Sequence, residues 1–400
     1  MNVMRRLRGS IPALQLIALS ALVLTVVGTS WNRIGTSTQS LKTTSTSSCT
    51  PAATNPPHRL SLSNRYLSVG WFPFGVALSS DGKWAFAASG ADLDVFEVRS
   101  DQLIPFRTIP LGGSGAGIAL SPNNKFLVVT NGAAGGSIMS VRNAISSTSI
   151  QAPSSMTVPA GAEAIEAAIS PDSQYAFVTF EGSSEVAVFH VTIDSLGDTS
   201  VTLIRTIHVA PGPVGITMSP SGRWAYVVSE FGGGPNGRLT VINARTAELG
   251  GSNPITASVL VGCSPVRVIT SNNGTLVWVT IRGSDSVVAY LARNLLSGGE
   301  PKPAIKVRVG PAPVGLAVVG DRNVLAVVNS NRFGGSDGDI ELITLTLKPH
   351  PRAAPDGVIP AHYFPREIVS SPDGRLLLVG DYGAGQLQLI NLGTEPHLTH

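Results

Sequence analysis

Residues 213–229 read PVGITMSPSGRWAYVVS, and this stretch contains the unit from which the fold is built. A proline opens a short apolar strand, SPSG forms a tight turn, and an aromatic and β-branched strand follows. In such a turn, Pro presets its own φ and Gly adopts a positive φ that other residues avoid. The stretch therefore predicts a β-hairpin.

The hairpin pattern occurs seven times along the chain. The other copies read PFGVALSSDGKWAFAAS (73–89), SGAGIALSPNNKFLVVTN (114–131), AIEAAISPDSQYAFVTF (164–180), PVRVITSNNGTLVWVTI (265–281), PVGLAVVGDRNVLAVVN (313–329) and PREIVSSPDGRLLLVGD (365–381). Their turn residues are Asp81, Asn123, Asp172, Ser221, Asn273, Asp321 and Asp373. The mean spacing of about 49 residues is typical of a propeller with four strands per blade.

Each copy can be completed to four strands. A third, alternating strand is expected at 239–242 in the fourth copy, and edge strands are expected at 107–111 and 306–310. Four strands cannot bury both apolar faces alone, but blades stacked in a ring bury both faces and leave no end blade exposed. The sequence therefore predicts an all-β, seven-bladed β-propeller of antiparallel blades over residues 59–393.

The last copy lacks its fourth strand, because the chain has no further strand pattern after 389–392. An unassigned strand, RYLSVG at 65–70, precedes the first copy and has the same Val-Gly ending as the edge strands. We therefore predict that residues 64–69 supply the outer strand of the last blade, so that both ends of the domain share one sheet.

Composition excludes several classes of protein. Charged residues make up only 13% of the 400 residues, too few for long charged helices or coiled coils. The hydrophobic share of 43% excludes disorder over most of the chain. The net charge is +3 and the basic residues are scattered, so no nucleic-acid partner is predicted.

The N-terminus is expected to direct export. Three arginines (Arg5, Arg6 and Arg8) precede an uncharged apolar run at 11–28. Residues 1–30 are therefore either a cleaved signal peptide or an uncleaved membrane anchor, and both place the protein outside the cytoplasm, secreted or periplasmic. Residues 31–58 are rich in Ser and Thr and are expected to be a flexible stalk; residues 394–400 form a tail.

The two cysteines are Cys49, in the expected stalk, and Cys263. An oxidising compartment permits a disulfide between them, but two cysteines do not make a disulfide framework, and two isolated thiols are the favoured interpretation.

One position of the repeat indicates where a site could lie. Two residues after the start of each blade, most copies have Gly, whereas three have a charge: Glu166, Arg267 and Glu367. Arg366 directly precedes Glu367. These side chains could form a polar ligand site at the channel mouth, with a glutamate as general base and Arg267 holding a carboxylate or phosphate. They could instead form a structural ion pair between blades, and the sequence favours this interpretation.

Loops expected on the same face supply further candidates. Two of these loops are long, at 230–237 and 329–339, and long loops on a rigid scaffold often bind ligands. The predicted ligand-binding residues are Glu166, Arg267, Arg366, Glu367, Glu230, Phe231, Arg282, Arg332, Asp381 and Tyr382.

Other motifs are discounted. The GGSDG run at 334–338 fits the pattern around a catalytic serine, but a strand is expected after it instead of a helix. Asp337 and Asp339 lack the full spacing of a calcium loop. The seven histidines show no zinc-binding spacing. We therefore predict no metal and no cofactor.

The repeat resembles that of the YVTN family of β-propellers, within the lactonase-like seven-bladed group. VVTN at 128–131, AYVV at 225–228 and AFVT at 176–179 are similar to the tetrapeptide that names the family. The resemblance covers residues 64–393. It implies an extracytoplasmic propeller, and it makes lactone hydrolysis an alternative function with Glu166, Arg267, Glu367 and His362 as its site.

The order of these residues does not match a known catalytic set. The leading hypothesis is therefore a non-catalytic module that binds a small molecule or an envelope protein. The expected protein is a monomer that contacts a membrane only through residues 11–28, if these are not cleaved.

Overall fold

The structure, a computed structural model, describes Cys49 and residues 58–148, 152–156, 158, 161–347 and 350–393. The predicted signal or anchor (1–30), the predicted tail (394–400) and the predicted stalk, except for Cys49 and His58, lie outside the described residues. Among the described residues, no helix has the length and apolar character needed to cross a membrane.

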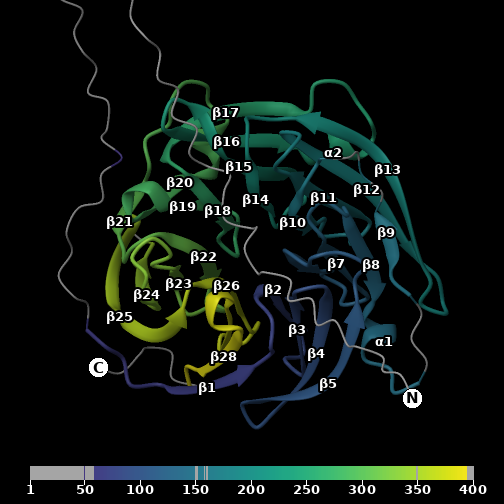
Figure 1. The fold of residues 1–400 in the computed structure, drawn as a ribbon. Coiled ribbons are helices and arrows are strands. Elements are labelled where there is room, and N and C mark those ends of the chain that lie inside the picture. Colours follow the sequence, from purple (N-terminus) through teal and green to yellow (C-terminus); the bar gives the residue numbers. More distant parts are fainter. Residues whose placement is uncertain are drawn as a thin grey trace, which may run out of the picture. The chain divides into compact units, whose positions relative to one another are not determined.

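The described strands form seven antiparallel sheets of four strands each, arranged as blades around a common axis (Figure 1). Blade 1 contains β2 (Pro73–Leu78), β3 (Trp84–Ser89), β4 (Asp92–Arg99) and β5 (Gln102–Pro110). Blade 2 contains β6 (Ile118–Leu120), β7 (Phe126–Thr130), β8 (Gly136–Ser140) and β9 (Ser154–Met156). Blade 3 contains β10 (Ala164–Ile169), β11 (Tyr175–Phe180), β12 (Glu185–Ile193) and β13 (Thr199–His208). Blade 4 contains β14 (Pro213–Met218), β15 (Trp224–Gly233), β16 (Asn236–Asn243) and β17 (Ile255–Cys263).

The remaining three blades follow the same plan. Blade 5 contains β18 (Pro265–Thr270), β19 (Leu276–Ile281), β20 (Ser286–Leu291) and β21 (Ile305–Arg308). Blade 6 contains β22 (Pro313–Val318), β23 (Val324–Asn329), β24 (Asp337–Thr346) and β25 (Arg352–Tyr363). Blade 7 contains β26 (Pro365–Ser370), β27 (Leu376–Asp381), β28 (Gln386–Asn391) and, as its outer strand, β1 (Ser63–Ser68).

The first strand of each blade is the inner one. It contacts the first strands of both neighbouring blades, and β26 of blade 7 contacts β2 of blade 1. Buried apolar side chains form clusters between adjacent blades, including one in which Val76 and Phe96 of blade 1 pack with Leu378 and Leu387 of blade 7. Stacking therefore buries both faces of the blades, and the predicted seven-bladed, all-β fold is confirmed.

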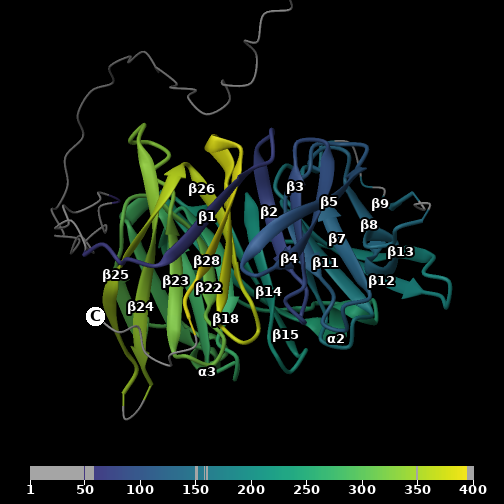
Figure 2. The same ribbon diagram turned by 90° about the horizontal axis from the view of Figure 1, so that it is seen from below.

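Strand β1 pairs antiparallel with β28, with Arg65 opposite Leu389 and Tyr66 opposite Gln388. Just before it, Arg59 forms a parallel bridge with Val358 on β25 of blade 6. The segment at 58–68 therefore runs across the outer edges of blades 6 and 7 (Figure 2).

The short helices mark the two faces of the ring. Helices α1 (Val141–Ala144), α2 (Ala244–Glu248) and α3 (Ala292–Leu295) follow third strands. The 3₁₀ turns η1 (Arg282–Ser284) and η2 (Tyr382–Ala384) follow second strands. Because strands alternate in direction, the connections after second and fourth strands share one face, which we call the mouth face. Helices α2 and α3 lie at the opposite face (Figure 2).

One expected loop has a different structure. Residues 230–237 were predicted to be an open loop, but β15 and β16 extend through this stretch until Gly233 lies opposite Asn236. Before this pair, the backbone N–H groups of Glu230 and Phe231 donate to the carbonyl oxygens of Gly212 and Pro211, which holds both residues against the turn before β14.

The cysteine pairing that the sequence left open is present as a disulfide between Cys49 and Cys263, with a Cα–Cα distance of 5.7 Å. Cys263 is the last residue of β17. The bridge therefore attaches Cys49 to blade 4 at the mouth face.

Candidate functional site

The three charged positions singled out by the repeat lie on inner strands. Glu166 is on β10, Arg267 on β18 and Glu367 on β26. Each lies at a shift of register near the start of its strand. Such a bulge re-aims a side chain relative to the regular pleat, and here it allows side chains from alternate blades to meet across the channel.

Glycine at the same position of neighbouring blades leaves room for these side chains. A Cβ on Gly117 would lie 2.6 Å from the Glu166 Oε1 atom, and a Cβ on Gly215 would lie 2.7 Å from the Val266 carbonyl oxygen. No side chain fits where the inner strands approach each other so closely. The alternation of glycine and charge in the sequence therefore reflects the crowding of seven strands around one axis.

Arg267 joins both glutamates. Its Nη1 donates to Glu166 and its Nη2 donates to Glu367. All three side chains are largely buried, and only 9% of Arg267 is exposed. We call this group the channel triad.

The electrostatics of the channel triad follow from this pairing. Burial alone would lower the pKa of Arg267, but the carboxylates of Glu166 and Glu367 outweigh burial and raise it. Burial raises the pKa of Glu367, against the opposing effect of Arg267. Arg267 therefore stays positively charged, and both glutamates form ion pairs with its guanidinium group.

Arg366, the neighbour of Glu367, is in a different environment. Its guanidinium carbon lies 3.5 Å from the ring centroid of Phe74, 5.7 Å from that of Tyr382 and 5.9 Å from that of Phe364. Burial, Arg267 and Arg332 together lower the pKa of Arg366 to about 10. Its positive charge is stabilised by contacts with aromatic rings and not by an ion pair with a carboxylate.

Arg332 shares this aromatic cluster. It lies 4.8 Å from the Phe364 centroid and 5.3 Å from the Phe333 centroid. Burial and then Arg282 lower its pKa. Among the described residues, neither Arg332 nor Arg366 has a carboxylate within ion-pair distance.

Arg282 and Glu230 form the next part of the mouth face. Arg282 Nη2 donates to Glu230 at 2.7 Å, which joins blades 4 and 5. Glu230 opposes the lowering of the Arg332 pKa. Burial raises the pKa of the half-buried Glu181, and Arg366 and Arg282 oppose this shift. The loops that the sequence indicated are therefore electrostatically connected around the mouth.

The remaining predicted residues lie apart from this cluster. Phe231 is exposed beside Gly212. Asp381 is fully buried, and one of its oxygens accepts a hydrogen bond of 3.4 Å from the backbone N–H of His362. The His362 ring stacks on Tyr66 at the outer seam of blades 6 and 7, away from the channel triad.

Sequence reasoning missed the aromatic partners of the arginines. Phe74 and Phe364 directly flank blade-opening prolines, Pro73 and Pro365, and that position was the available signal. Phe364 has a φ of 50°, which is costly for a bulky residue. Ser264 and Ala312 adopt the same backbone at the corresponding turns, so this conformation belongs to the blade connection.

No group of three or more His, Cys, Asp or Glu side chains is placed to hold a metal ion within the described part of the chain. The side chains described at the mouth supply guanidinium groups, carboxylates and aromatic rings.

The fold defines the chain as a seven-bladed β-propeller, and solved structures agree. It is similar to the structure titled Kuenenia stuttgartiensis hydrazine synthase (TM-score 0.61, 15% identity, covering 82% of this chain and 98% of that chain). It is also similar to the β-propeller domain of Cps50 (Swd1) from Myceliophteria thermophila (TM-score 0.61, 11% identity, covering 82% of this chain and 100% of that chain). A chain of a mitotic checkpoint complex is similar as well (TM-score 0.64, 13% identity, covering 86% of this chain and 100% of that chain). At these identities the likeness concerns the fold alone. No family model and no curated protein matches the sequence.

Proposed function

We propose that this chain is an exported, non-catalytic β-propeller whose mouth face binds an anionic group of a small ligand or an envelope protein. One observation carries the proposal: two of the four arginines at the mouth, Arg332 and Arg366, stack on aromatic rings and have no carboxylate partner among the described residues. A ligand carboxylate or phosphate would supply the missing counter-charge.

The energetics favour such a ligand. Burial, Arg267 and Arg332 lower the pKa of Arg366, and burial and Arg282 lower the pKa of Arg332. Both arginines are partly withdrawn from water. An arriving anion would relieve this repulsion, and a guanidinium can bind carboxylate or phosphate through two parallel hydrogen bonds. Exposed aromatic side chains on the same face, Phe333 and Phe72, would add apolar contact.

The channel triad argues against turnover. In a lactonase-type reaction, Arg267 would hold the substrate and a glutamate would act as base, but Arg267 is already bound by both glutamates. Substrate would have to break a buried ion pair before binding. We therefore assign the triad to the stability of the ring and the free arginines to ligand binding.

Export and family are part of the same proposal. The disulfide supports an extracytoplasmic location, because disulfides persist in oxidising compartments. The YVTN-like tetrapeptides and the seven-bladed fold support a place among the YVTN-family propellers.

The test is binding of benzoate and of inorganic phosphate to the full chain, measured by titration calorimetry. We expect Arg332→Gln together with Arg366→Gln to weaken binding about tenfold or more, since each loses a charge-assisted contact. Arg293→Gln, an exposed arginine on α3 at the opposite face, is the matched control and should change nothing.

Two results would refute the proposal. One is equal binding by the wild type and the double arginine variant. The other is hydrolysis of a sugar lactone by the wild type and by the Arg293→Gln control, because that activity would support the lactonase alternative.

A further inference from the structure

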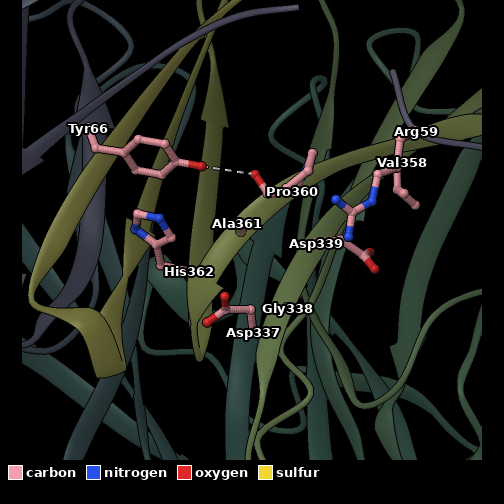
Figure 3. Close-up of a pocket in the computed structure, with 9 residues that line it drawn as sticks. All are labelled: Arg59, Tyr66, Asp337, Gly338, Asp339, Val358, Pro360, Ala361 and His362. Atoms are coloured by element: carbon pink, nitrogen blue, oxygen red, sulfur yellow. Dashed lines mark hydrogen bonds between the residues drawn. The ribbon is translucent and has the colours of Figure 1, made fainter. Parts of the chain in front are cut away.

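A cavity of about 330 Å³ lies at the seam between blades 6 and 7. Strands β24 and β25 of blade 6 form one part of its wall, and the N-terminal segment at 58–68 forms another. In Figure 3, Tyr66 and His362 lie on one side, Arg59 and Asp339 lie on the other, and Asp337 lies below the space between them.

One wall of the cavity is aromatic and fixed. The Tyr66 and His362 rings stack with centroids 4.1 Å apart, and the Tyr66 hydroxyl donates to the Pro360 carbonyl oxygen at 3.2 Å. His362 Nδ1 bonds to the Gln386 Oε1 atom at 2.5 Å. An amide oxygen only accepts, so Nδ1 is the donor of this hydrogen bond and the ring is held in place.

The floor of the cavity adds more acceptors. Asp337 and Asp339 are two positions apart on β24 and therefore lie on the same side of that strand. Asp339 accepts from Asn329 at 2.7 Å. The Asp337 carboxylate has no hydrogen bond or ion pair within the described part of the chain, so its oxygens are available to a ligand.

Negative charge exceeds positive charge here. Two carboxylates line the cavity against one guanidinium, that of Arg59. Directly behind the backbone of His362, Asp381 is fully buried, and its Oδ1 atom has no partner among the described residues. Burial and then Asp337 raise the pKa of Asp381, although its contact with His362 opposes this shift. Carboxyl groups therefore outnumber cationic groups around this cavity.

We propose that this cavity binds a small organic cation with a primary ammonium group, which donates to the Asp337 carboxylate and to other acceptors of the lining. An ammonium group has three donors and no acceptor, and it therefore matches a wall rich in acceptors. A carboxylate or phosphate would meet repulsion from Asp337. The site is separate from the mouth arginines and does not rest on the function proposed for them.

Ligand binding here should also strengthen the ring. Arg59 and Tyr66 belong to the N-terminal segment, whereas Asp337 and His362 belong to blade 6. A ligand in a cavity lined by both parts binds the folded chain and not the unfolded one, so it raises stability by mass action.

Three four-carbon probes that differ in charge test the proposal: butylamine, butyrate and 1-butanol. Their binding to the full chain is measured by ligand-observed NMR titration. We expect butylamine to bind about tenfold more tightly than either of the others, because a hydrogen-bonded charge pair contributes this much. Asp337→Asn should weaken butylamine binding about tenfold. The matched control is Asp321→Asn, an exposed aspartate in the blade 6 turn at the opposite face.

A thermal-shift measurement gives an independent readout of the same site. Butylamine should raise the melting temperature of the wild type and of Asp321→Asn, but not that of Asp337→Asn. The proposal is overturned if butyrate or 1-butanol binds as tightly as butylamine, if butylamine does not bind, or if Asp337→Asn binds it like the wild type.

Discussion

Replacing Arg267 with methionine is expected to lower the free energy of unfolding at pH 7 by about 3–5 kcal/mol, because it leaves two buried carboxylates without a counter-charge. Glu166 and Glu367 both receive hydrogen bonds from this guanidinium and are largely removed from water. Guanidinium-chloride unfolding of the variant and the wild type measures the difference. Arg293→Met, on the exposed surface of α3, is the control and should cost less than about 0.5 kcal/mol.

A triple variant separates loss of charge balance from loss of packing. Glu166→Gln, Arg267→Met and Glu367→Gln together remove all three charges while keeping similar volumes. Replacing a complete buried ion group is often close to neutral, so the triple variant should recover most of the loss. If the single Arg267→Met variant is as stable as the wild type, then Arg267 does not supply the counter-charge that Glu166 and Glu367 need.

Asp381 is expected to make the protein less stable as the pH rises from about 4 to 8. Burial, the largest cause, raises the pKa of this carboxyl from 3.8 to about 7. Between these two values the folded chain binds more protons than the unfolded chain, so stability falls with rising pH. The full effect is on the order of 4 kcal/mol, since each pKa unit corresponds to about 1.4 kcal/mol.

Asp381→Asn isolates this contribution from that of other carboxyls with raised pKa values, such as Glu341. The amide does not titrate, so the free energy of unfolding of the variant should increase relative to that of the wild type as the pH rises. Unfolding free energies at pH 4.5 and pH 8 give the comparison. Parallel pH profiles for the two proteins would mean that Asp381 does not titrate in this range.

The internal repeat made the fold predictable, because seven copies of one hairpin require seven similar blades. It also made the channel triad predictable as a set of positions, since a charge where other copies have glycine stands out in a repeat. The sequence favoured an ion pair between blades at these positions, and the structure has this pair, but the sequence left a ligand site open. Whether Arg267 binds the two glutamates or a ligand depends on how far the bulges turn each side chain toward the axis.

The aromatic environment of Arg366 could not be read from the sequence. Phe74 comes from blade 1, and Phe364 comes from the turn that precedes blade 7. They meet only because the ring returns to its starting point. The cavity at the blade 6–7 seam has the same origin, because Arg59 and Tyr66 reach it from the opposite end of the chain.

Hydrogen exchange of the backbone amides in β1 tests the central claim most directly, because both candidate sites depend on a ring closed between β1 and β28. We expect peptides covering 63–68 to exchange at least about a thousandfold more slowly than an unstructured chain, with protection similar to that of 386–391. Exchange of 63–68 at the rate of an unstructured peptide, while the other blades stay protected, would contradict it.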